Sequence, residues 1–362
     1  MIEDAVPSPR GRRAIVLPGG ANRGAYQAGA LAGLAVSEGR STGTPFACDF
    51  VGGASSGAIN AYLIATARYD RLHEVWRAFA QRHVLRLKPR YGGLAASASP
   101  DAKGLARRAA AMVGRTLAGL DLALGMSRYE RALADGTSVE KLLDDYVDPD
   151  AEVFVPLYVT ATNLTRRAGE MFSLRATAVD GHVAQTANDA LLRAYDRSRI
   201  TVVDGFTVRL ALFASAALPL VFDPVRIPLE TIWERADEYV DGGLTENAPI
   251  EAAVACADRL DVVMVDPPQT RAEISYANAL EIGVGVYDTL QRIILDGQLR
   301  LAFGGIARGT AAPAIRVIRP DRPLPGRYGD FNDLAAIEEM FARGYDDGRR
   351  GWSEARNPIP TP

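Results

Sequence analysis

Two neighbouring serines stand between glycines in the stretch VGGASSGAINA (residues 51–61), directly after an apolar run. Residues 53–57 (GASSG) fit the G-x-S-x-G pattern, in which the central serine sits on a sharp turn between a strand and a helix. Such a turn exposes the serine oxygen as a nucleophile, and glycines suit the flanking positions because the chain packs closely there. We therefore expect Ser55 to be a nucleophile and the Ser56 amide to face the negative charge that develops during the reaction. A loose turn without chemistry is the alternative, since Gly and Ser are common turn residues.

A second glycine turn, residues 18–24 (PGGANRG), follows the first apolar strand and opens a helix. It lacks the G-x-G-x-x-G spacing of a dinucleotide loop and the lysine of a phosphate-binding loop. We expect the amides of Gly19, Gly20 and Ala21 to form an oxyanion hole at the start of the helix, with Arg23 adding positive potential. A tight turn that only begins the helix is the alternative interpretation.

A hydroxyl nucleophile needs a neighbouring base, and the three histidines of the chain are poor candidates. His73 and His83 fall in a helical region, and no histidine follows His182, whereas α/β-hydrolases place theirs late in the chain. Asp241 instead ends a short apolar strand in the segment EYVDGGLTENAPI. A partly dry pocket would raise the pKa of this aspartate and make it a better base. Its alternative role is to cap a turn, which is common in Asp-Gly sequences.

The elements that position these residues alternate between strands and helices. Two strand-turn-helix units open the chain, at residues 13–36 and 48–69. This alternation predicts a parallel sheet with functional groups at the carboxyl ends of its strands. Residues 69–149 change to a helical pattern without strands, which we interpret as an insertion over one end of the sheet. Further strands are predicted at residues 152–164, 260–268 and 314–320. Two long helices are predicted at residues 276–303 and 333–350.

The composition limits the classes of protein to consider. The 362 residues carry a net charge of -3, which gives no reason to expect nucleic acid as a partner. Cys48 and Cys256 lack metal-binding spacing and are expected to be free thiols, so no metal is predicted. The first 13 residues do not read as a signal peptide, and no apolar run reaches membrane-spanning length. We expect a cytoplasmic protein that could still contact a membrane surface, and the frequent Arg and Ala are typical of a GC-rich bacterial genome.

Four blocks of the sequence together resemble the patatin-like phospholipases: residues 17–31 (LPGGANRGAYQAGAL), 51–61, 213–225 (FASAALPLVFDPV) and 240–250 (VDGGLTENAPI). The resemblance implies an α/β fold, a three-layer α/β/α sandwich with a mostly parallel central sheet, and a dyad of Ser55 and Asp241. It implies that no metal or organic cofactor is needed. The oxyanion and substrate-binding residues that it implies match those of the two turns above, namely Gly19, Gly20, Ala21, Arg23 and Ser56. Ala21 departs from the family, which commonly has a third glycine there.

The resemblance also implies the organisation and the activity of the chain. We expect one domain over residues 10–320, with a lid-like helical insertion at 69–149, and a C-terminal helical extension at 321–362 that packs on it. The expected function is that of a lipid acyl hydrolase that forms an acyl-enzyme on phospholipid, lysophospholipid or another acyl ester, with peripheral contact to a membrane or micelle. Two alternatives stay open, namely a non-catalytic lipid-binding or regulatory protein and an acyltransferase.

Overall fold

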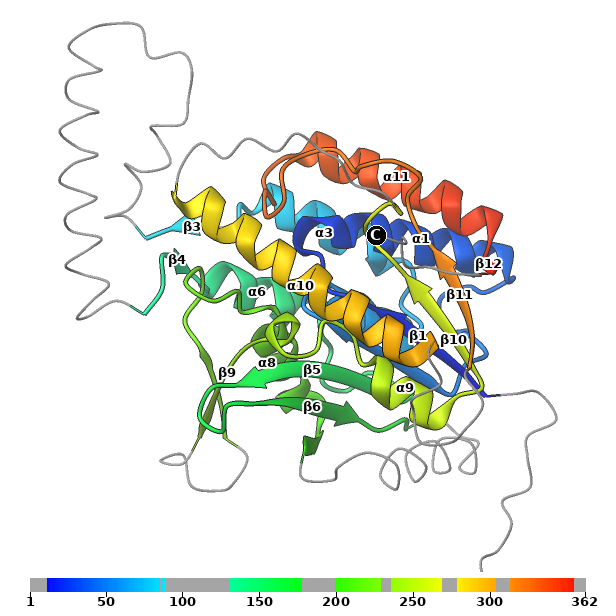
Figure 1. Ribbon diagram of the computed structural model, residues 1–362, viewed down its shortest axis with the longest axis horizontal. Helices are drawn as coiled ribbons and strands as arrows, with labels where there is room; N and C mark the ends of the chain where they lie inside the picture. The colour runs from blue at the N-terminus through cyan, green and yellow to red at the C-terminus, as the bar shows by residue number, and fades with distance from the viewer. Residues whose placement is uncertain are drawn as a thin grey trace, which may run out of the picture.

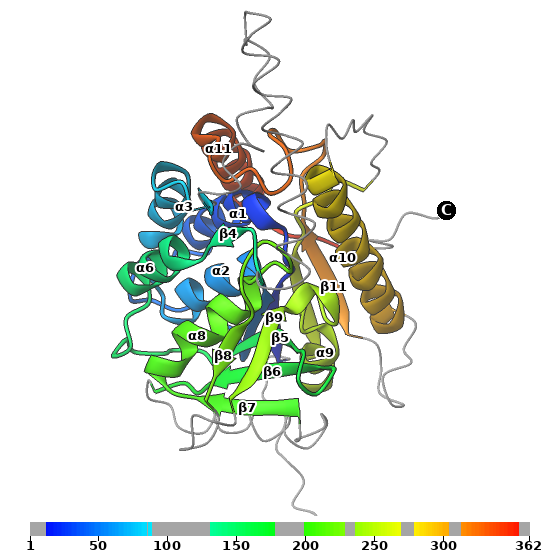
Figure 2. The same cartoon turned by 90° about the vertical axis from the view of Figure 1, so that its left-hand side faces the viewer.

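Ten strands of the computed structural model form one sheet with helices on both faces (Figure 1). The structure describes residues 12–84, 86–88, 131–177, 199–228, 236–268, 279–303 and 313–354. Figure 2 shows the layers with α1, α2, α3, α8 and α11 on one side of the sheet and α9 and α10 on the other. The predicted three-layer α/β/α arrangement is confirmed.

The centre of the sheet is parallel, as the alternation of strands and helices predicts. Its strands are hydrogen-bonded in the order β11-β10-β1-β2-β5, and all four pairs are parallel. The bounds are Ala314–Ile318 for β11, Arg259–Val263 for β10, Arg13–Leu17 for β1, Phe50–Ala54 for β2 and Leu157–Asn163 for β5.

Antiparallel strands extend the sheet at both ends. At one end, β12 (Ser353–Glu354) pairs with β11. At the other, β5 pairs with β6 (Ala168–Leu174), which in turn runs parallel to β7 (Ile200–Val203). A separate hairpin of β8 (Val225–Ile227) and β9 (Asp237–Asp241) joins the sheet because β9 pairs antiparallel with β5.

The central strands are apolar because helices cover both faces of the sheet there. Every residue of β1 and β2 is buried, which is typical of parallel strands between two helical layers. Side chains alternate across a strand, so Ile15 and Leu17 pack in the cluster that includes α1 and α2. Ala14 and Val16 pack in the opposite cluster, with residues of α9 and α10.

The helices divide between these two layers. The first layer contains α1 (Gly24–Ser37), α2 (Ser56–Ala65), α3 (Arg71–Gln81), α8 (Gly205–Ala216) and α11 (Leu334–Arg350). The second contains α9 (Ile250–Cys256) and α10 (Ala279–Phe303). Within the described ranges, no helix combines the length and the apolar character that a transmembrane span requires.

The region predicted as a strand-free insertion, residues 69–149, differs from that prediction. It contains α3 and α6 (Thr137–Tyr146), but also a pair of two-residue antiparallel strands, β3 (Arg86–Leu87) and β4 (Ala134–Asp135). Strands this short are missed because two residues leave no alternating pattern in the sequence. The side chain of Trp76 on α3 is fully buried, so α3 belongs to the core of the sandwich. Residues 85 and 89–130 of the predicted insertion lie outside the described residues.

Candidate active site

Ser55 occupies the sharp turn between β2 and α2 with a left-handed backbone, at φ 52° and ψ −126°. This conformation is strained for a residue with a Cβ, and such strain is characteristic of functional turns. The flanking glycines allow the turn: a Cβ at Gly53 would lie 2.5 Å from the Gly57 carbonyl, and one at Gly57 would lie 2.1 Å from Leu17 O. The two glycines of the motif are therefore required by close packing of the backbone.

The sheet register explains how Ser55 and Asp241, far apart in the sequence, come together. Strands β2 and β9 lie along the same edge of β5, with Ala54 opposite Thr160 and Asp241 opposite Ala161. Because β2 is parallel to β5 and β9 is antiparallel to it, the carboxyl ends of β2 and β9 point at each other. Ser55, directly after β2, therefore adjoins Asp241, the last residue of β9.

The Asp241 carboxylate is completely buried, and its two oxygens differ in their surroundings. Oδ1 accepts hydrogen bonds from the Gly243 amide at 2.8 Å and from Nε2 of Gln291 at 3.3 Å. Oδ2 is buried and has no hydrogen-bond partner among the described residues. The unpaired oxygen leaves the carboxylate one acceptor for a proton from a nearby group.

Burial raises the pKa of Asp241 to about 6, although the Ser55 hydroxyl, the Gly243 amide, Tyr287 and Gln291 each oppose the rise. The register of β2 and β9 brings Ser55 next to Asp241, and the Ser55 hydroxyl is one of the groups that lower the pKa of this carboxyl. A carboxylate with a pKa near neutrality is a far better base than an ordinary aspartate while it stays ionised at pH 7.

The glycine turn after β1 differs from the prediction in how its amides are used. The Gly19 amide donates to both the main-chain and side-chain oxygens of Asn247, each at 3.1 Å, and the Gly20 amide donates to Oγ of Ser56 at 3.0 Å. Both amides thus have acceptors within the protein, whereas the sequence predicted them as oxyanion donors. The Ala21 amide makes no hydrogen bond to a described residue. Ala21 has a positive φ of 49°, the conformation in which the family's glycine would be unstrained.

Ser56 begins α2, where the first amides of a helix have no partner inside the helix. Its amide has no acceptor among the described residues, so it stays available to an anion. Its hydroxyl holds the Gly20 amide, which ties the glycine turn to the nucleophile turn. The side chain therefore has a structural task that the sequence did not reveal.

The sequence suggested that Arg23 adds positive potential beside the glycine turn. In the structure its guanidinium is instead paired with two carboxylates. It donates to Asp266 at 2.9 Å and to Asp288 at 3.0 Å, and it lies 4.7 Å from the centre of the Tyr328 ring. Burial alone would lower the pKa of Arg23, but the two carboxylates raise it. Since these acids neutralise its charge, Arg23 connects the start of α1 to β10 and α10 and supplies little free potential.

Several residues around Ser55 and Asp241 were not singled out in the sequence. Ser215 of α8 accepts a 2.8 Å hydrogen bond from the Ser55 amide, so the block 213–225 supports the turn directly. Tyr287 and Gln291, which face Asp241, and Tyr328, which contacts Gln291, lie outside any recognisable motif, and no signal in a single sequence would have found them.

The two histidines that the structure describes contact neither Ser55 nor Asp241. His73 pairs with Glu338 at 2.7 Å and stacks on Phe341, which places it between α3 and α11. His83 is exposed at the end of α3. His182 lies outside the described residues.

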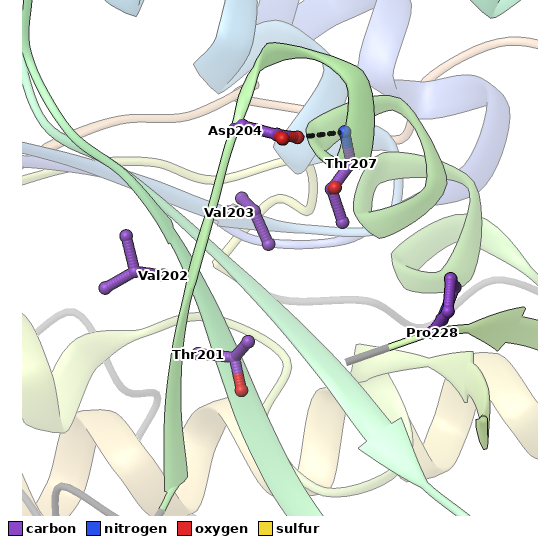
Figure 3. A pocket seen from close by; sticks show the side chains of 6 residues that line it. All are labelled: Thr201, Val202, Val203, Asp204, Thr207 and Pro228. Atoms are coloured by element: carbon purple, nitrogen blue, oxygen red, sulfur yellow. Dashed lines mark hydrogen bonds between the residues drawn. The ribbon is translucent and has the colours of Figure 1, made fainter. Parts of the chain in front are cut away.

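A cavity of about 350 Å³ lies at the far end of α8 from Ser215 (Figure 3). In it the Asp204 carboxylate caps α8 by accepting the Thr207 amide at 2.7 Å. None of its lining residues is Ser55 or Asp241, and none is a cysteine or a histidine. The cavity is therefore separate from the chemistry, and its lining is Thr201, Val202, Val203, Asp204, Thr207 and Pro228.

Comparison with known proteins identifies the family. A family model described as patatin-like phospholipase matches residues 15–254. No curated protein sequence matches the chain. Among the solved structures, the crystal structure of VipD from Legionella pneumophila is similar over 96% of this chain and 68% of that chain, with 12% sequence identity and a TM-score of 0.35. The matched range of the family model contains Ser55 and Asp241 but ends before Gln291 and Tyr328.

Proposed function

The chain belongs to the patatin-like phospholipase family, and we propose that it is a lipid acyl hydrolase whose catalytic dyad is Ser55 and Asp241. The observation that carries the proposal is the buried Asp241 carboxylate beside the Ser55 hydroxyl, with a pKa raised to about 6 and one oxygen unpaired. Asp241 also caps the turn that follows it, because its Oδ1 accepts the Gly243 amide, but a turn cap alone would need neither the raised pKa nor the neighbouring hydroxyl. A non-catalytic lipid-binding protein on the same fold would need neither residue.

In the acylation step, Oδ2 of Asp241 accepts the proton of the Ser55 hydroxyl as Oγ attacks the carbonyl carbon of the ester. The tetrahedral intermediate collapses, the bond to the leaving alcohol breaks, and that alcohol takes the proton from Asp241. In the second step Asp241 takes a proton from water, whose oxygen attacks the acyl-serine. The fatty acid leaves and the proton returns to Ser55, so that the protein is regenerated without a metal or an organic cofactor.

The oxyanion of the tetrahedral intermediate needs donors that are not already used. Since Gly19 and Gly20 donate to acceptors within the protein, we assign this role to the amides of Ala21 and Ser56, which have none among the described residues. Ser56 starts α2, and the positive end of the helix dipole favours the negative charge. Gly19 and Gly20 then act by holding the shape of the loop. In this assignment the loop after β1 still contributes to the oxyanion hole, as the sequence predicts, but through Ala21 alone and not through Gly19 and Gly20.

The proposal is tested by replacing the nucleophile. Ser55→Ala should reduce hydrolysis of p-nitrophenyl butyrate and of mixed phospholipid–detergent micelles by about a thousandfold or more, because the covalent step is lost. Ser41→Ala, which changes an exposed loop serine, is the matched control and should keep the wild-type rate. If Ser55→Ala retains the wild-type rate while folded, the proposal is wrong.

An acyltransferase would use the same acyl-enzyme and pass the chain to an alcohol or thiol. Product analysis of the wild-type reaction with added glycerol separates the two activities. We expect free fatty acid to be the main product, whereas a predominance of acylglycerol would favour the transferase.

A further inference from the structure

Two side chains from beyond the family-matched range, Tyr287 and Gln291, face the Asp241 carboxylate, and a third, Tyr328, contacts Gln291. Tyr287 and Gln291 lie on α10, and Tyr328 lies in the connection between β11 and α11. Helix α10 packs against the short 3-10 turn Gly242–Leu244 that directly follows Asp241. Figure 2 shows α10 as the outer helix on its side of the sheet, so a segment late in the chain closes one side of the dyad.

The contacts of both the nitrogen and the oxygen of the Gln291 side-chain amide fix its orientation. An ionised carboxylate can only accept, so nitrogen Nε2 must face Oδ1 of Asp241, which lies 3.3 Å away. The amide oxygen then faces Tyr328, whose hydroxyl donates to Oε1 at 2.8 Å. The main-chain oxygen of Gln291 accepts a hydrogen bond from Nδ2 of Asn247 at 3.2 Å. Asn247 in turn accepts a hydrogen bond from the Gly19 amide. Gln291 thus connects the base to the glycine turn.

The second glycine after Asp241 is explained by this contact. A Cβ at Gly243 would lie 2.0 Å from Nε2 of Gln291, so any larger residue would push the amide away from the carboxylate. The glycine therefore does two things: its own amide binds Oδ1, and its missing side chain admits the second donor to the same oxygen.

We propose that Gln291, oriented by Tyr328, is a positioning residue of the dyad: it occupies Oδ1 of Asp241 and thereby reserves Oδ2 for the Ser55 proton. This inference rests on the proposed function and extends the site beyond the range that the family model matches. Gln291 acts through Asp241 and is not itself a reacting group.

The groups that face Asp241 from the packed elements are mostly neutral. Burial and the neighbouring Asp241 raise the pKa of Tyr287 well above its usual range. Burial, Asp288 and Asp241 likewise raise the pKa of Tyr328. Both hydroxyls therefore remain protonated between pH 4 and 9. The charged side chains beyond Tyr328 are Arg23, Asp266 and Asp288, and they are paired with one another. A titration in this range therefore reports the carboxylate.

The test compares the Asp241 pKa in full-length variants, measured by carboxyl ¹³C NMR with selectively labelled aspartate, using Asp241→Asn to assign the signal. Gln291→Leu removes a donor that favours the ionised form, so the pKa should rise by about one unit. Tyr328→Phe should raise it by less, because Gln291 remains but loses its orientation. The acid limb of kcat/KM for p-nitrophenyl butyrate should move upward with the NMR value.

Gln298→Leu is the matched control, because Gln298 is on the same helix but donates to the Ala248 carbonyl at 2.8 Å and does not contact Asp241. It should lower the melting temperature about as much as Gln291→Leu and leave both the pKa and the acid limb unchanged. If Gln291→Leu does not fold, the nearly isosteric Gln291→Glu replaces it and should raise the pKa further, because a second carboxylate then faces the first.

The outcomes separate this inference from the proposed function. A folded Gln291 variant with an unchanged Asp241 pKa and acid limb overturns the inference and leaves the hydrolase intact. An equal shift in Gln298→Leu also overturns it, because the effect would then be one of general helix stability. A wild-type protein that hydrolyses no ester contradicts the proposed function, whatever the NMR titration shows.

Discussion

At the residue scale, the Asp241 carboxylate is buried with neutral hydrogen-bond partners, and this burial costs the folded state free energy. The pKa of about 6 in the native protein lies above the ordinary value of 3.8. The native state therefore binds the proton more tightly than the unfolded state does, and stability falls as the pH rises between about 4 and 6. Above pH 6 the full cost of the buried charge is present.

Asp241→Asn should therefore stabilise the protein by about 3 kcal/mol at pH 8 while removing activity, because a neutral side chain replaces the buried charge. The gain should shrink from pH 6 to 4 and vanish only below about pH 3, where wild-type Asp241 is protonated in both states. Urea unfolding at pH 8, 6 and 4 measures it. An Asn variant that is less stable than wild type at pH 8 would show that the charge is not a cost.

The sequence pointed to Ser55 and Asp241 as the proposed reacting groups but not to how the loop amides are used. Ser55 and Asp241 were found because each lies in a local motif whose chemistry depends on neighbours in the chain. The acceptors of Gly19 and Gly20 come from Asn247 and Ser56, far along the sequence, and such pairings follow only from the fold. The same holds for the acids that neutralise Arg23.

At the element scale, α1 and α11 approach so closely that their backbones touch at glycines. A Cβ at Gly344 would lie 2.0 Å from the Tyr26 carbonyl oxygen, and one at Gly29 would lie 2.0 Å from that of Phe341. The hydroxyl of Tyr26 also donates to Asp347 at 2.6 Å across the same contact. The two helices are thus held by backbone proximity as well as by apolar side chains.

Gly344→Ala should cost about 3 kcal/mol, because the new methyl group forces two backbones apart. Gly297→Ala is the control, since it places the same methyl group in a helix where no atom lies within 4 Å, and it should stabilise the protein by about 0.5–1 kcal/mol. Thermal and urea unfolding measure both. Equal effects of the two changes would mean that the glycines at the α1–α11 contact are not required by packing.

The long elements could be predicted from sequence more readily than the short ones. The helices expected at residues 276–303 and 333–350 correspond to α10 and α11, whose periodic patterns span several turns. Strands β3, β4, β6, β7 and β12 were missed. The first two are too short to show a pattern. Strand β6 is the antiparallel partner of β5, and the sequence does not reveal which elements pack over it.

At the scale of the whole molecule, the segment after residue 320 is part of the fold. Ile337 and Met340 of α11 are completely buried in the cluster that contains α1 and α2. Tyr328, in the same segment, donates a hydrogen bond to Gln291 beside Asp241. We therefore propose that the C-terminal helical extension, residues 321–362, packs on the domain that it follows.

A chain truncated after residue 320 should fail to form a stable protein, because α1 would lose the helix that covers it. Size-exclusion chromatography and circular dichroism of the truncated chain check this, with the full-length protein as the control. A monodisperse fragment that unfolds cooperatively and keeps esterase activity would show instead that residues 321–362 are dispensable.

The most direct measurement is the rate and position of labelling by a fluorophosphonate, followed by intact mass and peptide mapping. We expect the wild-type protein to gain one adduct, on Ser55, and Asp241→Asn to react at least about a hundredfold more slowly, because the base no longer takes the serine proton. An adduct on a different serine, or equal rates in the two proteins, would contradict a dyad of Ser55 and Asp241.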